Sequence, residues 1–226
     1  MIDEIRMEFD EEGLRIRATD PGNTSLVDIR YPRDSFDVYE VENHGSIGLN
    51  LATLMKLLKR AKRGSRLEIE ADDENVELRL IAGYTRRYRL RNLEVMLPAL
   101  PEGELSLKTR VTMLVDPLEK VLKDIQVVGE VVILEYNSGE EKFMAYTQEG
   151  GKYRMELTRD SEAVIEMSGD EDAKAAYDVD SLVRVLQLTR VSETVGLEFS
   201  SDAPLRMEFD LPQGGQFVYF LAPHLL

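Results

Sequence analysis

Apolar side chains recur at three- and four-residue steps along residues 51–63, which is the spacing of one face of an α-helix. The stripe consists of Leu51, Leu54, Met55, Leu58 and Ala61. The same spacing predicts helices over residues 116–125 and 179–189. Asp116 is the expected N-cap of the first of these, with Pro117 at its first helical position.

Elsewhere apolar and polar residues alternate, which is typical of strands that bury one face. Turn-forming runs rich in Gly, Pro, Asn and Asp separate these stretches, for example at residues 20–23 and 137–139. We therefore expect an α+β fold of antiparallel sheets. The predicted strands cover residues 6–10, 14–18, 26–31, 46–49, 67–71, 76–81, 84–90, 108–114, 131–136, 142–146, 152–157, 163–167, 195–199, 205–211 and 217–221.

The predicted order of helix, strand, turn, strand and strand occurs twice. Residues 49–70 align with residues 177–198 at a constant offset of 128, so that Leu54 meets Leu182 and Leu58 meets Leu186. A repeat longer than roughly 50 residues indicates a duplicated domain rather than a solenoid unit. Two prolines and a glycine in residues 97–103 stop any regular element and predict a connector between the copies. The expected divisions are an N-terminal domain, a connector and a C-terminal domain, at residues 1–91, 92–106 and 107–226.

The two copies are unequal at their beginnings. The second copy opens with a predicted strand and helix over residues 108–125, whereas the first has only residues 1–4 before its first hairpin. We therefore expect roughly 20 residues to be absent from the start, judged by the spacing of the second copy. A helix there would bury about four apolar side chains, each contributing about 1.5–3 kcal/mol, so the first domain should be weakened on one face. A start codon assigned too late, or a shortened chain, would explain the difference.

The chain is acidic overall but carries a local run of cations on one predicted helix. The 226-residue chain has a formal net charge of -15, yet Lys56, Lys59, Arg60, Lys62 and Arg63 follow one another without an acid among them. A net negative protein is a poor open-groove binder of nucleic acid, because its surface repels phosphate. Cations gathered inside a closed assembly would still bind a phosphate backbone. A solvated helix face is the alternative interpretation of this run.

The sequence lacks the residues that several kinds of catalytic or metal site require. The chain has no Cys, and its two histidines, His44 and His224, are far apart in sequence, so we expect no cofactor and no histidine or cysteine metal cluster. No glycine-rich phosphate loop and no Ser/His/Asp set shows catalytic spacing, which argues against an enzyme. The acidic run at residues 170–172 could bind Mg²⁺, and a nuclease or polymerase would need such a site; an acidic turn is the simpler interpretation. No apolar run approaches the length of a membrane span, about 18 residues, and the acidic N-terminus lacks a signal peptide's apolar core, so we predict a cytoplasmic protein without membrane contact.

Five stretches, read in order, resemble the proliferating cell nuclear antigen family of DNA sliding clamps, in its archaeal form. They are EEGLRIRATDPGN (11–23), FDVYEVEN (36–43), IGLNLATLMKLLKRAKRGSRL (47–67), LPALPEG (97–103) and FVYFLAPHLL (217–226). None is specific alone, but together with the twofold repeat they cover nearly the whole chain. The chain departs from the family by the missing first strand and helix, and by ending directly after LAPHLL without a longer acidic tail.

The resemblance implies a DNA-clamp fold with helices on one face of antiparallel sheets. It implies a ring of three such subunits that encircles duplex DNA without reading its sequence and tethers replication and repair proteins. The DNA-facing cations of the family fall on Lys56, Lys59, Lys120 and Lys123. Position on the predicted helices adds Arg60, Arg63, Arg184 and Arg190 to this DNA-facing set. One basic position of the family is Gln187 here, which should weaken that contact. The subunits could be identical or could alternate with paralogues.

The resemblance also implies two kinds of protein contact. Edge strands at residues 85–93 and 152–157 would pair between subunits, through Arg87, Tyr88, Arg89, Tyr153, Arg154 and Met155. The alternative is that both strands are internal to their own sheets. Peptide motifs of DNA polymerase, clamp loader, ligase and nuclease would enter an apolar pocket formed by Leu26, Val95, Leu97, Pro204, Phe220, Ala222 and Pro223. From sequence alone, Leu97 and Phe220 would more often be core residues than pocket residues, and it is the resemblance that favours the pocket. A second functional hypothesis is a clamp-like scaffold that binds protein partners or paralogues and never encircles DNA.

Overall fold

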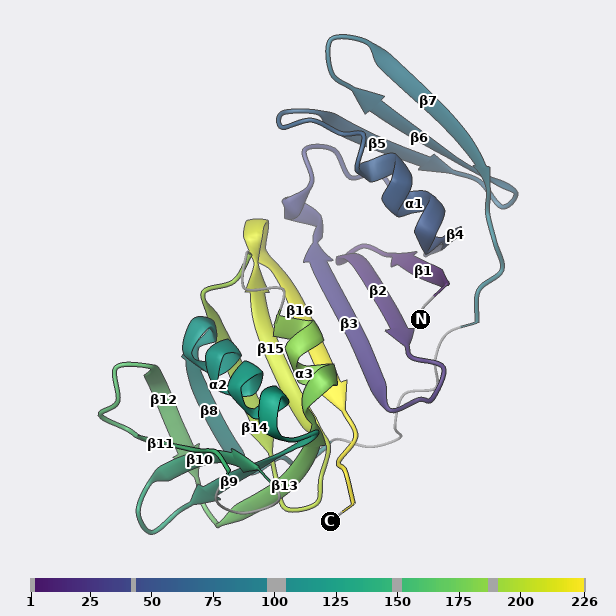
Figure 1. The fold of residues 1–226 in the computed structure, drawn as a ribbon. Helices are drawn as coiled ribbons and strands as arrows, with labels where there is room; N and C mark the ends of the chain where they lie inside the picture. The colour runs from purple at the N-terminus through teal and green to yellow at the C-terminus, as the bar shows by residue number, and fades with distance from the viewer. Residues whose placement is uncertain (1–2, 42–43, 97–104, 148–151, 187–190, 226) are drawn as a thin grey trace. The chain divides into compact units, whose positions relative to one another are not determined.

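The structure is a computed structural model that describes most of the chain, namely residues 3–41, 44–96, 105–147, 152–186 and 191–225. It divides into two compact units, which are Met1–Asn23 with Asp28–Leu100, and Thr24–Val27 with Pro101–Leu226. Both consist of antiparallel sheets with short helices packed against them (Figure 1). The expected α+β architecture of two similar halves is confirmed.

The first unit is built on two groups of strands and one helix. The first group, in spatial order, is β3 (Ser25–Pro32), β2 (Gly13–Thr19), β1 (Glu4–Phe9) and β4 (Gly45–Asn50). The second group is β5 (Arg66–Ala71), β6 (Asn75–Ile81) and β7 (Thr85–Arg91). Helix α1 (Leu51–Leu58) follows β4 directly. Its buried Leu54 joins a core of Ile5, Met7, Ile47, Leu49, Val76 and Leu78.

The second unit has a larger set of strands and two helices. Its first group, in spatial order, is β12 (Val164–Gly169), β8 (Thr109–Leu114), β14 (Thr194–Phe199), β15 (Leu205–Leu211) and β16 (Gly215–Leu221). Its second group is β11 (Arg154–Thr158), β10 (Lys142–Thr147), β9 (Val131–Asn137) and β13 (Ala173–Asp178). Helices α2 (Val115–Val128) and α3 (Val179–Val185) lie side by side across one face of these strands (Figure 1).

The same polar interaction starts a helix in each unit. The side chain of Asn50 accepts a hydrogen bond from the Thr53 N–H at 2.9 Å, and α1 begins. The side chain of Asp178 accepts from the Ser181 N–H at 2.8 Å, and α3 begins. Both are N-caps, which satisfy a donor that the first helical turn leaves without a partner. The two caps are 128 residues apart, so the repeat inferred from apolar positions holds for capping as well.

Three details of the predicted elements are wrong. The helix expected over residues 51–63 ends at Leu58, and Met55 and Ala61 of its expected apolar stripe are exposed, whereas Leu57 packs against the core. After Leu58 there is no large apolar residue to bury, and a run of like charges opposes further helix. The strand β13 is absent from the predicted strands, although it lies 128 residues after β4, which is the offset of the repeat.

Helix α2 also differs from its prediction at both ends. Its N-cap is Leu114, which makes no side-chain capping bond, and Asp116 lies inside the first turn. A carboxylate there still complements the positive end of the helix dipole. The helix continues past Ile125 to Val128, because the first residue that breaks it is Gly129. The described part of the helix expected over residues 179–189 ends at Val185. The other predicted strands are found with ends shifted by at most two residues.

One apolar face of the first unit is open. In the second unit β14 pairs with β8, and Leu118 and Leu122 of α2 lie around Leu197. The repeat equivalents of Val195 and Leu197 are Leu67 and Ile69 of β5. Val195 and Leu197 are 0% and 1% exposed, whereas Leu67 and Ile69 are 40% and 37% exposed. Within the described residues β5 pairs only with β6, so the face that β8 and α2 cover in the second unit is uncovered here. No helix in the described part of the chain is both long and apolar enough to cross a bilayer.

The segment that follows β7 is tied to the first unit at its first residues. The Asn92 side chain accepts from the Gly48 N–H at 2.8 Å and donates to the carbonyl oxygens of Ser46 and Asp72. The Leu93 N–H donates to the Gly48 carbonyl oxygen at 2.9 Å. A Cβ atom at Gly48 would overlap the Leu93 carbonyl oxygen and lie 3.0 Å from Val95 Cγ2. The absence of a side chain at Gly48 therefore lets the connector cross β4.

We predict that Gly48→Ala displaces the start of the connector and lowers the free energy of unfolding by about 2 kcal/mol, as overpacking does. Denaturant unfolding and amide hydrogen exchange at residues 92–96 measure the two effects. Gly45→Ala is the matched control, since the same strand has open space around that position. Equal effects of the two substitutions would contradict the role given to Gly48.

Candidate nucleic-acid interface and partner surfaces

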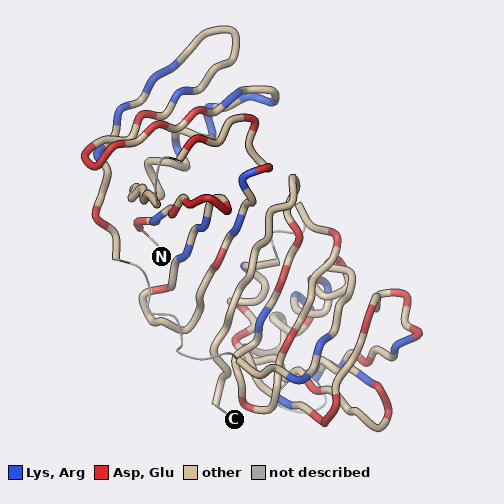
Figure 2. The backbone as a smooth tube through the Cα atoms, turned by 180° about the vertical axis from the view of Figure 1, so that it is seen from behind, with Lys and Arg blue, Asp and Glu red and all other residues tan. Residues whose placement is uncertain are grey.

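The end of α1 carries a group of cations that is free of acids. Lys56, Lys59, Arg60, Lys62 and Arg63 are all exposed, and none forms an ion pair with any residue that the structure describes. The helical hydrogen-bonding continues as turns, with Lys59 N–H donating to Met55 O and Arg60 N–H to Leu57 O, both at 3.0 Å. In Figure 2 the run from Lys56 to Arg66 shows no acidic position. Arg63 thus lies on a turn, not on the helix as expected, but the cations stay together.

The helices of the second unit are less basic than expected. Lys120 and Lys123 of α2 are exposed, but Lys123 Nζ lies 2.6 Å from Glu119 Oε1. Asp116 and Asp124 add two further carboxylates, so α2 has more acids than lysines. Such an ion pair, one helical turn apart, leaves less charge for a polyanion.

Helix α3 contributes one described cation. The Arg184 side chain is 69% exposed, and its Nη2 donates to Ser181 Oγ at 2.9 Å and lies 4.0 Å from the capping Asp178 carboxylate. Arg190 and Gln187 lie outside the described residues. Among the described helices, then, α1 is the one whose charged residues are cations alone.

Two strands that the resemblance implied as subunit contacts lie at sheet edges. Within the described residues β7 pairs only with β6, and β11 only with β10. Arg87 and Arg89 are exposed on β7, and Tyr88 is half-buried between them. On the other edge Arg154 is exposed and Met155 is half-buried. Tyr153 is half-buried just before β11, and burial together with a hydrogen bond to Asp124 raises its pKa. The alternative that both strands are internal does not hold for this part of the chain.

The implied pocket residues fall mainly within the second unit. The Ala222 N–H donates to the Thr24 carbonyl oxygen at 2.8 Å, which joins the end of β16 to the residues that precede Leu26. The register of β15 and β16 pairs Leu205 with Leu221, so Pro204 and Ala222 follow as neighbours. Leu26 is buried, Pro204, Phe220 and Pro223 are half-buried, and Ala222 is exposed. Val95 is half-buried in the first unit, and Leu97 lies outside the described residues.

The acidic turn at residues 170–172 uses its carboxylates on the protein itself. Asp172 Oδ1 accepts from the Ser138 N–H and from Ser138 Oγ, both at 2.8 Å, and these bonds lower its pKa. Glu171 Oε1 lies 2.9 Å from Lys108 Nζ. The described residues contain no group of three or more acids or histidines placed to hold a metal ion. An acidic turn therefore accounts for these side chains.

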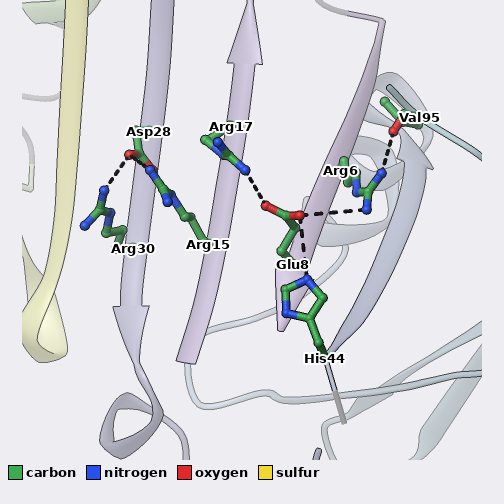
Figure 3. Close-up of polar contacts among 8 residues, drawn as sticks. All are labelled: Arg6, Glu8, Arg15, Arg17, Asp28, Arg30, His44 and Val95. Atoms are coloured by element: carbon green, nitrogen blue, oxygen red, sulfur yellow. Dashed lines mark hydrogen bonds and ion pairs between the residues drawn. The ribbon is translucent and has the colours of Figure 1, made fainter. Parts of the chain in front are cut away.

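The polar face of β1, β2 and β3 carries a set of ion pairs that the sequence pattern did not predict. Figure 3 shows this arginine belt, which we define as Arg6, Arg15, Arg17 and Arg30 with Glu8 and Asp28. Arg15 holds Asp28 through Nε at 2.9 Å and Nη2 at 2.7 Å, and Arg30 Nη2 donates to the same carboxylate at 3.0 Å. Arg17 Nη2 donates to Glu8 at 2.8 Å, and Arg6 lies 3.7 Å from Glu8. The every-second-residue spacing of these charges was the signal in the sequence.

Burial and ion pairing act in opposite directions on Asp28. Burial raises the pKa of its carboxyl group, but hydrogen bonds from Arg15 and Arg30 outweigh this, so the pKa lies below its ordinary value of 3.8. The hydrogen bond to Asp28 in turn raises the pKa of Arg15. The carboxylate stays charged and fixes both guanidinium groups in place.

Two duplicated antiparallel units, each with a side-chain-capped helix after its sheet, make up the architecture of a DNA clamp. Comparison with known proteins agrees. Residues 1–102 match the N-terminal domain of proliferating cell nuclear antigen (PCNA) and residues 101–224 match its C-terminal domain, so the chain belongs to the PCNA family of sliding clamps. The resemblance inferred from sequence is thereby confirmed.

Curated relatives and solved structures extend over nearly the whole chain. DNA polymerase sliding clamp 1 of Aeropyrum pernix is 36% identical over 221 residues, covering 94% of this chain and 87% of the relative. DNA polymerase sliding clamp 1 of Sulfolobus acidocaldarius is 31% identical over 99% of this chain and 91% of the relative. A PCNA2–PCNA3 complex from Sulfolobus tokodaii has a TM-score of 0.86 at 26% identity, over 99% of this chain and 91% of that one. PCNA from Thermococcus kodakaraensis, with a TM-score of 0.87 at 23% identity and the same coverage, shares the fold.

We predict that Asp28→Asn lowers the free energy of unfolding at pH 7 by about 2 kcal/mol, because two charged hydrogen bonds lose their acceptor charge. Since the folded pKa is below the unfolded one, this contribution is present above about pH 4 and disappears as the pH falls through the lowered folded pKa. Denaturant unfolding of both proteins between pH 7 and pH 3 should show their difference shrinking. Asp210→Asn, at an exposed aspartate of β15, is the control and should show no such convergence.

Proposed function

We propose that this chain is a ring-forming clamp that encircles duplex DNA and tethers replication and repair proteins, without catalysing a reaction. The acid-free, exposed cations from Lys56 to Arg63, in a chain of net charge -15, are the observation that carries the proposal. A strongly negative exterior repels DNA, so a local cationic surface is useful where the protein surrounds the duplex. Contacts to phosphates do not depend on the base sequence, so the protein would be able to slide along the duplex.

The DNA-facing residues in this proposal are not equivalent. Lys56, Lys59, Arg60 and Arg63 belong to the acid-free group and would contribute most. Lys120 and Lys123 of α2, with Arg184 and Arg190, would contribute less, because Glu119 and Asp178 neutralise part of the charge beside Lys123 and Arg184. Since phosphate binding releases counterions, the whole interaction should weaken steeply with salt.

Ring closure in the proposal uses the two sheet edges. The edge of β7, through Arg87, Tyr88 and Arg89, would pair with β11 and its neighbour, through Tyr153, Arg154 and Met155, of the next subunit. Such a head-to-tail contact generates a closed ring when the rotation per subunit fits. An unpaired edge strand is otherwise open to aggregation, which pairing removes.

Partner proteins in the proposal present a short peptide to the pocket formed by Leu26, Val95, Leu97, Pro204, Phe220, Ala222 and Pro223. Apolar anchors seated in a hydrophobic groove are a common mode of peptide recognition. DNA polymerase, the clamp loader, ligase and nuclease are the partners that the family membership suggests. The half-buried Phe220 and Pro223, beside the exposed Ala222, support a surface pocket rather than a closed core.

The subunits of the ring are either three copies of this chain or copies mixed with paralogues. The solved PCNA2–PCNA3 complex from Sulfolobus tokodaii supports mixed assembly in a similar protein. A scaffold that never encircles DNA would keep the pocket and the edges but have no use for an acid-free cationic group.

We predict that the double variant Lys56→Glu with Lys59→Glu reduces stimulation of a DNA polymerase on primed circular DNA by at least about tenfold, because reversed charges repel phosphate. Peptide binding should be unchanged. The control is Lys108→Glu with Lys142→Glu, which changes net charge equally at lysines paired with Glu171 and Glu140. Equal loss in both double variants would point to net charge alone, and no loss in either would favour the scaffold.

We also predict that the protein, with any paralogue it requires, has the mass of three subunits in solution and keeps it when salt is raised from about 0.1 to 0.5 M. Main-chain hydrogen bonds between edges are not screened by salt, whereas phosphate contacts are. Light scattering measures the mass, and retention on closed circular DNA measures the contacts in the same samples. A single-chain mass at every salt concentration and with every paralogue would overturn the ring.

A further inference from the structure

The arginine belt is a local excess of positive charge with no role in the proposed ring. It contains four guanidinium groups and two carboxylates, whereas the chain as a whole has a net charge of -15. The carboxylates are its most buried members, with Asp28 and Glu8 side chains 7% and 11% exposed. Its outward surface therefore consists of arginine side chains, of which Arg30 is 54% and Arg15 is 34% exposed.

The belt adjoins residues assigned to the partner pocket at both of its ends. At one end Arg6 Nη1 donates to the Val95 carbonyl oxygen at 3.2 Å, which ties the connector to β1 (Figure 3). At the other end Leu26, Asp28 and Arg30 alternate along β3, so they share one face of that strand. An acidic residue beside an anchor that contacts Leu26 would therefore face Arg30 on the same strand.

The geometry leaves donors available on the exposed arginines. Within the described residues Arg15 uses Nε and Nη2 on Asp28, and Arg30 uses Nη2 alone. Asp28 holds both guanidinium groups in fixed positions, so less side-chain entropy is lost when an incoming acid binds. A carboxylate is the ligand that matches a guanidinium fork.

Resting on the proposed partner pocket, we propose that the arginine belt binds acidic residues that flank the apolar anchors of a partner peptide. Arg30 and Arg15 make the contact, and Asp28 positions them. The belt thus adds a charge preference to a pocket that otherwise selects apolar side chains. Partners with acidic flanks bind more tightly than partners with neutral or basic flanks.

The test uses two fluorescent synthetic peptides with identical aliphatic and aromatic anchors. One has Asp and Glu on both flanks, and the other has Asn and Gln at the same positions. Fluorescence anisotropy with the full-length protein at about 50 mM salt should give about fivefold tighter binding of the acidic peptide, and the preference should fade at about 0.5 M salt. Arg30→Gln should abolish the preference while binding of the neutral peptide stays unchanged.

Two variants control for charge and folding. Arg30→Lys keeps the charge and should retain most of the preference, and a thermal unfolding scan shows that each variant is folded. Arg110→Gln removes a similarly exposed arginine that is paired with Glu198 in the second unit, and it should leave the preference intact.

The possible outcomes distinguish failure of the arginine belt proposal from failure of the proposed partner pocket. If both peptides bind equally well to the wild-type protein, the arginine belt proposal fails and the partner pocket stands. If neither peptide binds, the pocket itself fails, and the belt proposal with it. If Arg30→Gln instead weakens retention on duplex DNA and leaves the peptide preference intact, the belt contacts phosphates and the proposal is overturned.

Discussion

Two capping hydrogen bonds, at Asn50 and Asp178, determine how each half of this protein is built. Each bond stops a strand and starts a helix at the next residue, so α1 and α3 leave β4 and β13 in the same way. The start of the helix decides which side chains turn inward, and Leu54 and Leu182 are buried at equivalent positions. It also decides where the charges after Leu58 are displayed. The cationic group therefore depends on a neutral amide two turns before it.

Charge is distributed unevenly over the two similar units. The end of α1 is acid-free, whereas α2 pairs Lys123 with Glu119 and carries more acids than bases. On the β1–β3 face, buried carboxylates organise arginines instead of cancelling them. A protein with a large negative net charge can thus hold two distinct positive surfaces, one suited to a uniform polyanion and one suited to individual carboxylates.

Much of the fold could be predicted from the sequence, because the fold follows from the local spacing of apolar residues. The strands, the two-copy organisation and the family followed from apolar spacing and from short motifs. The length of α1 was not predicted correctly. Lys59 and Arg63 have helical spacing, but the residues after Leu58 include no large apolar side chain that a longer helix could bury. β13 was missed because its run of small residues lacks alternation; alignment with β4 would have revealed it. The arginine belt depends on three strands lying side by side, which no single stretch of sequence shows.

The anchoring of the connector has a mechanical consequence. Residues 92–95 are fastened to β4, to β1 and to the β5–β6 turn through Asn92, Leu93 and the Arg6–Val95 contact. Residues 92–95 of the connector are therefore fixed to the first unit. A force applied to the connector by a bound protein would be transmitted into the strands of the first sheet, and these hydrogen bonds, loaded in parallel, would share the strain.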